Sequence, residues 1–121
     1  MAEHHQTGKK GEALVLEHLR KEGFEIIATN WRYGPLEIDI VAREKNQLVI
    51  IEVKTRHSIK FGEPETLVNK KKQRYLAQAA NEYILQNNYL GETRFDIIGV
   101  LITPHQNEVR HIRDAFFPGL F

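Results

Sequence analysis

The sequence contains no cysteine, which excludes disulfide bonds and thiolate metal sites. Its 17 basic and 16 acidic side chains nearly cancel, so the net charge of +1 predicts no strong overall attraction to nucleic acid. Any such binding must come from local basic patches. There is no apolar run of membrane-spanning length and no apolar N-terminal signal. We therefore expect a cytoplasmic protein that does not associate with membranes.

Several familiar motifs are also missing. The six histidines show no zinc-site spacing, and there is no phosphate-cradling loop, dinucleotide fingerprint or nucleophile elbow. With 121 residues, 41% hydrophobic and 27% charged, the composition is typical of an ordinary globular protein. We expect residues 1–121 to form a single domain.

Hydrophobic spacing predicts two helices, three strands between them and at least one strand after the second helix. The expected helices cover residues 8–22 and 65–87, and the expected strands cover residues 24–31, 36–43, 47–55, 94–102 and 108–112. The order αβββαβ, with room for one more strand, predicts an α/β fold in which helices flank a mixed β-sheet.

Residues 36–56, LEIDIVAREKNQLVIIEVKTR, alternate like a β-hairpin but carry charges among isoleucines and valines. With a tight turn between the strands, Asp39 would lie opposite Glu52, and Glu37 opposite Lys54. Strict alternation also predicts that Ile38 shares a face with the next isoleucine, two residues on.

Two opposed carboxylates, at Asp39 and Glu52, would have Cβ atoms about 5 Å apart and would repel each other unless compensated. A divalent cation compensates naturally, because Mg²⁺ favours one or two carboxylates together with water and phosphate oxygens. Lys54, on the same face as Glu52, could orient an attacking water, so the pattern suits metal-assisted phosphodiester hydrolysis. A solvated strand face, with a simple ion pair between Glu37 and Lys54, is the alternative.

A third acid and a basic run could support such a site. Glu12 shares a helical stripe with apolar residues, where it could be a third ligand or accept hydrogen bonds from the ligands; the alternative is a solvent-exposed glutamate in a first helical turn. Lys72 extends the apolar face of the second helix; it could reach the site or snorkel at the edge of the core. The residues 115–121, AFFPGLF, are apolar and either fold back on the core or form a subunit interface.

The motifs Gly11-Glu12, Glu37-Ile38-Asp39 and Glu52-Val53-Lys54-Thr55-Arg56, together with Lys72 and Arg94-Phe95-Asp96, occur here in one order and spacing. In these the sequence resembles the YraN-like family of small bacterial proteins. That family is related by fold to archaeal Holliday-junction resolvases and to the wider PD-(D/E)xK nuclease superfamily. The resemblance covers nearly the whole chain and implies a restriction-endonuclease-like αβββαβ core.

The resemblance also implies a function and its residues. We expect a metal-dependent endonuclease acting on DNA, including branched or repair intermediates, with Mg²⁺ or Mn²⁺ as cofactor and a homodimer as assembly. Asp39, Glu52 and the carbonyl of Val53 would hold the metal, Lys54 would orient water, and Glu12 would complete the acidic cluster. The basic residues expected to contact nucleic acid are Lys9, Lys10, Arg32, Arg56, Lys70, Lys71, Lys72 and Arg74. The alternatives are a DNA-binding module without cleavage, and an interaction protein without a nucleic-acid ligand.

Overall fold

The computed structural model describes the backbone of residues 2–58 and 68–117, with side chains from residue 9 onward. Its element order is αβββαββ, so the predicted α/β core is confirmed and the additional strand is present. Each strand begins and ends within two residues of its predicted limits. The elements are α1 (Ala2–Lys21), β1 (Glu25–Tyr33), β2 (Leu36–Glu44), β3 (Gln47–Arg56), α2 (Lys70–Asn87), β4 (Glu92–Ile102) and β5 (Asn107–Ile112).

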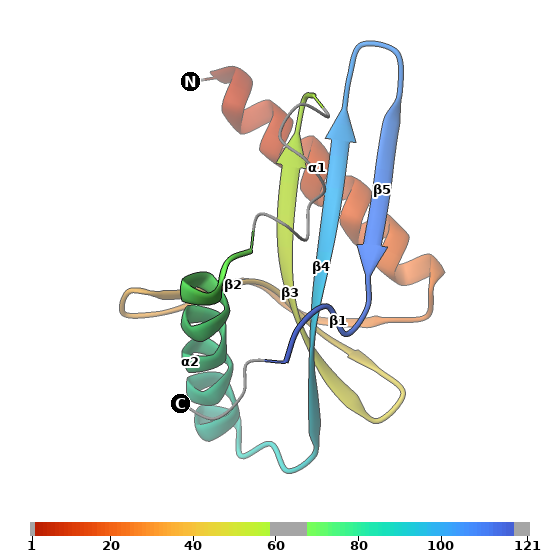
Figure 1. Cartoon of the computed structure of the whole chain (residues 1–121). Coiled ribbons are helices and arrows are strands. Elements are labelled where there is room, and N and C mark those ends of the chain that lie inside the picture. Colours follow the sequence, from red (N-terminus) through yellow and green to blue (C-terminus); the bar gives the residue numbers. More distant parts are fainter. Residues whose placement is uncertain (1, 59–67, 118–121) are drawn as a thin grey trace.

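The strands form one mixed sheet in the order β1-β2-β3-β4-β5 (Figure 1). Strands β3 and β4 pair in parallel, whereas the other neighbouring pairs are antiparallel. A parallel pair needs a crossover connection, and the segment that contains α2 provides it here. The β3–β4 pairing is long, from Gln47–Glu92 to Arg56–Leu101, and lies in the interior of the sheet.

The two helices cover opposite faces of the sheet. Val15 and Leu19 of α1 pack with Val49 and Ile51 of β3. Leu48 and Ile50, which alternate with these residues along β3, belong to a second hydrophobic cluster that includes residues of α2. Because alternate strand residues point to opposite faces, the sheet separates two hydrophobic cores. We call the cluster on the α2 side the α2 core and the one on the α1 side the α1 core. The residues that β3 and α2 contribute to the α2 core are Leu48, Ile50, Leu76, Ala79, Ala80 and Tyr83.

Both helices begin at positions other than those predicted. Helix α1 begins at Ala2, six residues early, because Gly8 lies within the helix and does not start it. Helix α2 begins at Lys70, where the side chain of Asn69 accepts a hydrogen bond from the Lys72 amide at 2.9 Å. An asparagine N-cap is a recognisable start signal, and the expected residues 65–67 lie outside the described part of the chain. Neither helix has the length and apolar character that a bilayer span requires.

The prediction of strict alternation along β2 is wrong at Asp39. Ile38 packs in the α2 core, but Ile40 packs in the α1 core, so the strand changes face between them. On β1, directly alongside, Asn30 adopts a left-handed conformation with φ 51°. Asn30 lies between the cross-strand pairs Thr29–Ile40 and Trp31–Ile38, so both strands deviate at the same level. This irregularity interrupts the pleat at the candidate acidic residue.

The beginning of the C-terminal tail folds back on the sheet. Ala115 donates its amide to the Phe95 carbonyl at 2.8 Å. The Phe116 ring stacks on the Phe95 ring at 5.1 Å, and both tail residues pack against the α2 core. Phe117 is exposed, and residues 118–121 lie outside the described part. Of the two arrangements expected for the tail, this part adopts the first, and homodimerisation stays a prediction.

Candidate functional site

The acidic pair lies where strands β2 and β3 separate. The predicted hairpin register is confirmed from Glu44–Gln47 to Ile40–Ile51, where the paired residues end. One position further on, the carboxylate of Asp39 accepts a hydrogen bond from the Val53 amide at 2.8 Å. The Asp39 side chain thus accepts the Val53 N–H, which a longer β2–β3 pairing would have bonded to a backbone carbonyl. This contact fixes the Asp39 carboxylate against the backbone of β3.

Asp39 and Glu52 are in direct contact, as the register predicted. Burial raises the pKa of Asp39 to about 7, and the hydrogen-bonded, negatively charged carboxyl group of Glu52 adds to the rise. Glu52 itself is only 5% exposed. At neutral pH Asp39 therefore carries a proton for part of the time, and a bound cation would compete with that proton.

Two lysines converge on the same oxygen of Glu52. The Nζ of Lys54 lies 3.6 Å from Oε2, and the Nζ of Lys72 lies 3.3 Å from it. The Lys72 ammonium also lies 4.5 Å from the centroid of the Tyr75 ring, a cation–π distance that holds it in place. Lys72 therefore reaches the acidic pair, and of its two expected positions the structure shows the first.

The alternative ion pair between Glu37 and Lys54 does not form. Glu37 instead lies 3.6 Å from Arg32 on the neighbouring strand; the Arg32 side chain is exposed and that of Glu37 is half-buried. Lys54 is left to Glu52, which is on its own strand and its own face. The alternative of a solvated strand face required an ion pair between Glu37 and Lys54, and this ion pair is absent.

Glu12 shares a cavity with Asp39. The cavity has a volume of about 180 Å³ and is lined by Glu12, Asn30, Asp39, Ile40 and Val53. The Asn30 amide lies 3.4 Å from the Glu12 carboxylate, so the left-handed residue of β1 also orients the acid on α1. At roughly 30 Å³ for each water, the cavity has room for several waters or a hydrated ion.

A glycine sets the approach of α1 to this cavity. A Cβ atom at Gly11 would lie only 2.9 Å from the Thr55 hydroxyl oxygen, closer than real Cβ contacts. Glycine therefore lets the helix lie directly against β3, one residue before Glu12. Because Gly11 lets α1 approach β3 closely, the next residue, Glu12, lies at the cavity.

The donor set suits a hard cation but is small. In the described ranges, no group of three or more His, Cys, Asp or Glu side chains is close enough to hold a metal ion. Mg²⁺ typically binds to proteins through one or two carboxylates and keeps several waters. Asp39 and Glu52 supply two carboxylates in contact, and Val53 lines the cavity together with Asp39. These residues fit a hydrated Mg²⁺ or Mn²⁺ ion, with Glu12 across the cavity.

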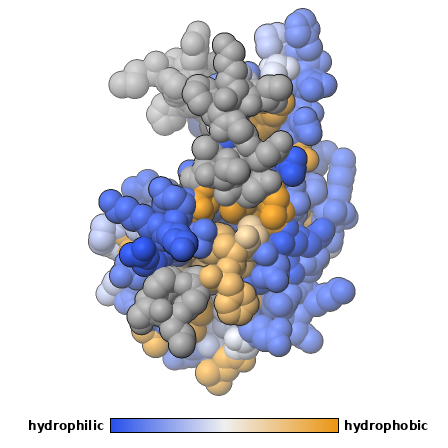
Figure 2. Space-filling view, viewed as in Figure 1, coloured by the Kyte–Doolittle hydropathy of each residue, from blue (hydrophilic) through white to orange (hydrophobic). Residues whose placement is uncertain are grey.

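The expected nucleic-acid contacts are spread over several surfaces. Lys9 and Lys10 are exposed on α1, in its third turn, because the helix begins at Ala2 and not at the expected residue 8. Lys70, Lys71 and Arg74 are exposed at the N-terminal end of α2, which is strongly hydrophilic in Figure 2. No acidic residue offsets these cations in the first turn of α2, although the helix dipole disfavours cations there.

Arg56 differs from the other basic residues because it is buried. It is 8% exposed, and none of its three guanidinium nitrogens has a hydrogen-bond partner among the residues that the structure describes. The sequence pattern gave Arg56 no property that separates it from the exposed cations.

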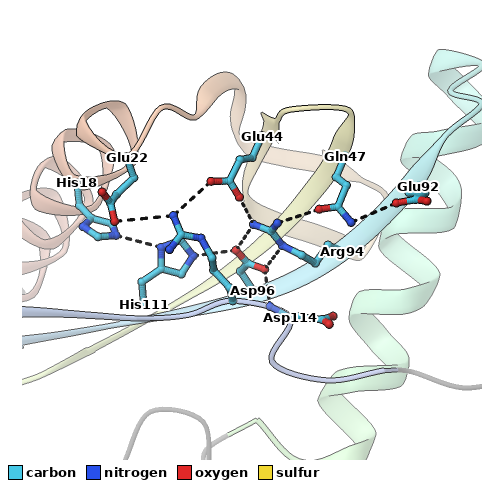
Figure 3. A network of polar contacts seen from close by, with 10 residues as sticks. His18, Glu22, Glu44, Gln47, Glu92, Arg94, Asp96, His111 and Asp114 are labelled. Atoms are coloured by element: carbon cyan, nitrogen blue, oxygen red, sulfur yellow. Dashed lines mark hydrogen bonds and ion pairs between the residues drawn. The ribbon is translucent and has the colours of Figure 1, made fainter.

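A second polar network lies elsewhere in the protein and was not predicted (Figure 3). Arg94 donates two hydrogen bonds to the fully buried Asp96, at 2.8 and 2.9 Å, and one to Glu44 at 2.8 Å. His111 lies 2.8 Å from Asp96 and 3.0 Å from His18. Histidines that look scattered in the sequence are therefore neighbours, and only the apolar surroundings of Asp96 hinted at a buried carboxylate.

This network holds its charges in place. Burial alone would raise the pKa of Asp96, but hydrogen bonds from His111 and Arg94 outweigh it and lower that pKa. Hydrogen bonding to Asp96 also raises the pKa of Arg94. The Asp114 amide donates to Asp96 at 3.0 Å, so the same carboxylate anchors the start of the C-terminal tail. We assign the network a structural role.

Comparison with known proteins adds the family. Residues 11–100 match the model of the uncharacterised protein family UPF0102. The chain belongs to this family. UPF0102 is the YraN-like family, so the resemblance noted from the motifs is confirmed. The matched region contains both carboxylates of the acidic pair and both of its lysines.

Members of UPF0102 match this chain over nearly its full length. The UPF0102 protein of Flavobacterium psychrophilum is 47% identical over 117 residues, which cover 97% of this chain and 98% of the relative. The UPF0102 protein of Bacteroides thetaiotaomicron is 41% identical over 121 residues, with both chains covered completely. The names of these relatives state no activity.

Proposed function

We propose that this UPF0102 member is a metal-dependent endonuclease that hydrolyses DNA phosphodiester bonds, with branched or repair intermediates as substrates. One observation carries the proposal: Asp39, which lines a cavity, touches the carboxylate of Glu52, and two lysines pair with Glu52. Such a pair is unfavourable for stability alone, because like charges in contact oppose folding. It becomes favourable when a cation binds.

Each residue has a separate part in the proposed reaction. Asp39 and Glu52, with the carbonyl of Val53, would hold Mg²⁺ or Mn²⁺, which supplies positive charge for the phosphate and makes water more acidic. Lys54, which pairs with Glu52, would orient the attacking water. Lys72, which pairs with the same oxygen, would stabilise charge that develops on the phosphate, and Glu12 would accept hydrogen bonds from water across the cavity.

The surroundings favour a polyanionic substrate. Lys70, Lys71 and Arg74 form an exposed basic surface on the same helix as Lys72. Contacts from such residues to backbone phosphates position a nucleic acid without reading its sequence. The basic surface therefore adjoins the proposed reacting centre and could hold the strand that is cut. Arg32 on β1 and the lysines of α1 are further proposed contacts.

A cleavage assay tests the proposal. Linear, flapped, single-stranded and four-way-junction DNA are incubated with protein and Mg²⁺ or Mn²⁺, or with a chelator. We expect metal-dependent products from at least one DNA form, and a rate at least about 100-fold lower for Glu52→Gln and Lys54→Met. Glu37→Gln is the matched control, because Glu37 lies on the same hairpin but pairs with Arg32 outside the acidic pair.

Each other outcome contradicts cleavage by this site in a distinct way. Equal products from all proteins identify a contaminating nuclease. Binding of DNA without products under any condition favours the DNA-binding module. No binding even at low salt, where basic patches act most strongly, favours an interaction protein without a nucleic-acid ligand.

A further inference from the structure

Within the described part of the chain, the guanidinium of Arg56 lacks the partners that a buried charge requires. All three of its nitrogens are out of contact with solvent, and none has a hydrogen-bond partner among residues 2–58 and 68–117. A buried and unpaired charge is strongly unfavourable, so such groups are normally paired or serve a ligand. Arg94 shows the usual solution in this same protein, with bonds to Asp96, Glu44 and Gln47. Arg56 is therefore the exception that needs an explanation.

The position of Arg56 relates it to the acidic pair. Along β3, Thr55 contacts Gly11 of α1, whereas Glu52 contacts Lys72 of α2. Alternation then places Glu52, Lys54 and Arg56 on the α2 face of the sheet. At about 3.3 Å per residue, the Cα atoms of Lys54 and Arg56 are about 7 Å apart. A ligand held by Arg56 would thus lie next to the proposed reacting centre.

We propose that Arg56 forms a phosphate-binding site that receives a phosphate group of the nucleic acid next to the bond that is cut. A guanidinium presents its donors in a planar fork, which matches two oxygens of a phosphate. Three cations, Arg56, Lys54 and Lys72, accompany the two carboxylates of the acidic pair, and both lysines pair with the same oxygen of Glu52. An anion is therefore the ligand that completes both the hydrogen bonding and the charge.

The nucleic-acid source of the phosphate rests on the proposed function, but the phosphate chemistry does not. Arg56 would bind phosphate without a metal and without cleavage. In the free protein its nitrogens are covered, so binding must displace covering atoms. The arginine contributes no stability until the anion arrives, and this distinguishes it from a structural arginine.

Thermal unfolding with inorganic phosphate, in a chelator and at constant ionic strength, tests the proposal first. We expect phosphate to raise the Tm of the wild-type protein by about 5 °C at tenfold over its Kd, and to leave Arg56→Met unchanged. Without phosphate, Arg56→Met should melt at the same temperature as the wild type or higher. The control is Arg43→Met, which removes an exposed arginine paired with Glu25 and should keep the phosphate response.

Two results would overturn the proposal. One is an equal phosphate response in Arg56→Met and wild type. The other is a Tm several degrees lower for Arg56→Met without phosphate, which would show that Arg56 already has a structural partner. Both readouts are independent of metal and of cleavage, so they separate this inference from failure of the nuclease proposal.

A binding assay then identifies the source of the phosphate. Short single-stranded DNA with a 5′-phosphate or a 5′-hydroxyl is titrated into both proteins in chelator. We expect Arg56→Met to weaken binding at least tenfold. A loss confined to the 5′-phosphate DNA assigns the site to a terminal phosphate, and an equal loss for both assigns it to an internal phosphodiester. No loss for either DNA contradicts the nucleic-acid role.

Discussion

Arg94→Met is expected to lower the free energy of unfolding by about 3–5 kcal/mol. The substitution removes the paired hydrogen bonds to Asp96, whose carboxylate is fully buried, and the bond to Glu44. Asp96 would keep its contacts with His111 and the Asp114 amide but lose its permanent counter-charge. Urea unfolding at neutral pH, followed by circular dichroism, measures the loss.

Two further variants separate lost charge pairing from lost packing. In Arg94→Met/Asp96→Asn the buried group carries no charge, so part of the lost stability should return. Arg43→Met removes an exposed arginine 3.7 Å from Glu25, and its effect should stay below about 0.5 kcal/mol. A loss below 1 kcal/mol in Arg94→Met would contradict the structural role of the network.

Asp39→Asn is expected to stabilise the metal-free protein at pH 8 by on the order of 5 °C in Tm. The folded pKa of Asp39, about 7, lies above its ordinary value of 3.8. The folded protein thus binds the proton more tightly, and this stability is present below pH 3.8 and lost as the pH rises through 7. An uncharged asparagine avoids that loss, because it leaves no second negative charge beside Glu52.

Melting curves in chelator from pH 4.5 to 8.5 test this expectation. The difference in Tm between Asp39→Asn and wild type should be small at pH 4.5 and should grow up to about pH 8. Glu37→Gln controls for a general effect of removing an acid from this hairpin, since Glu37 is only half-buried and pairs with Arg32. A variant less stable than wild type at pH 8 would show that the Asp39 charge supports the fold.

The hairpin was predictable because local features determine it. The turn and the alternating pattern set the register of β2 and β3, which holds from Glu44–Gln47 to Ile40–Ile51. That register also brought Asp39 to Glu52. The acidic pair could therefore be derived from one stretch of 21 residues, LEIDIVAREKNQLVIIEVKTR.

The other features depend on contacts between distant segments. The face change at Asp39 coincides with the left-handed Asn30 on β1, and alternation along β2 alone carries no sign of it. His18 and His111 are separated by 93 positions in the sequence, so their contact follows only from the packing of α1 against β5. The isolation of Arg56 is a property of burial, which no spacing of charges reveals.

Calorimetric titration of Mn²⁺ into the wild-type protein, Asp39→Asn and Glu37→Gln tests the metal site most directly. At pH 8 we expect Mn²⁺ to bind at one site in the wild type and in Glu37→Gln, and not to bind to Asp39→Asn. Below pH 7 the wild-type affinity should fall by about tenfold per pH unit, because protons compete for the carboxylate pair. Equal binding by wild type and Asp39→Asn, or no binding by the wild type at pH 8, would contradict the assignment of Asp39 and Glu52 as metal ligands.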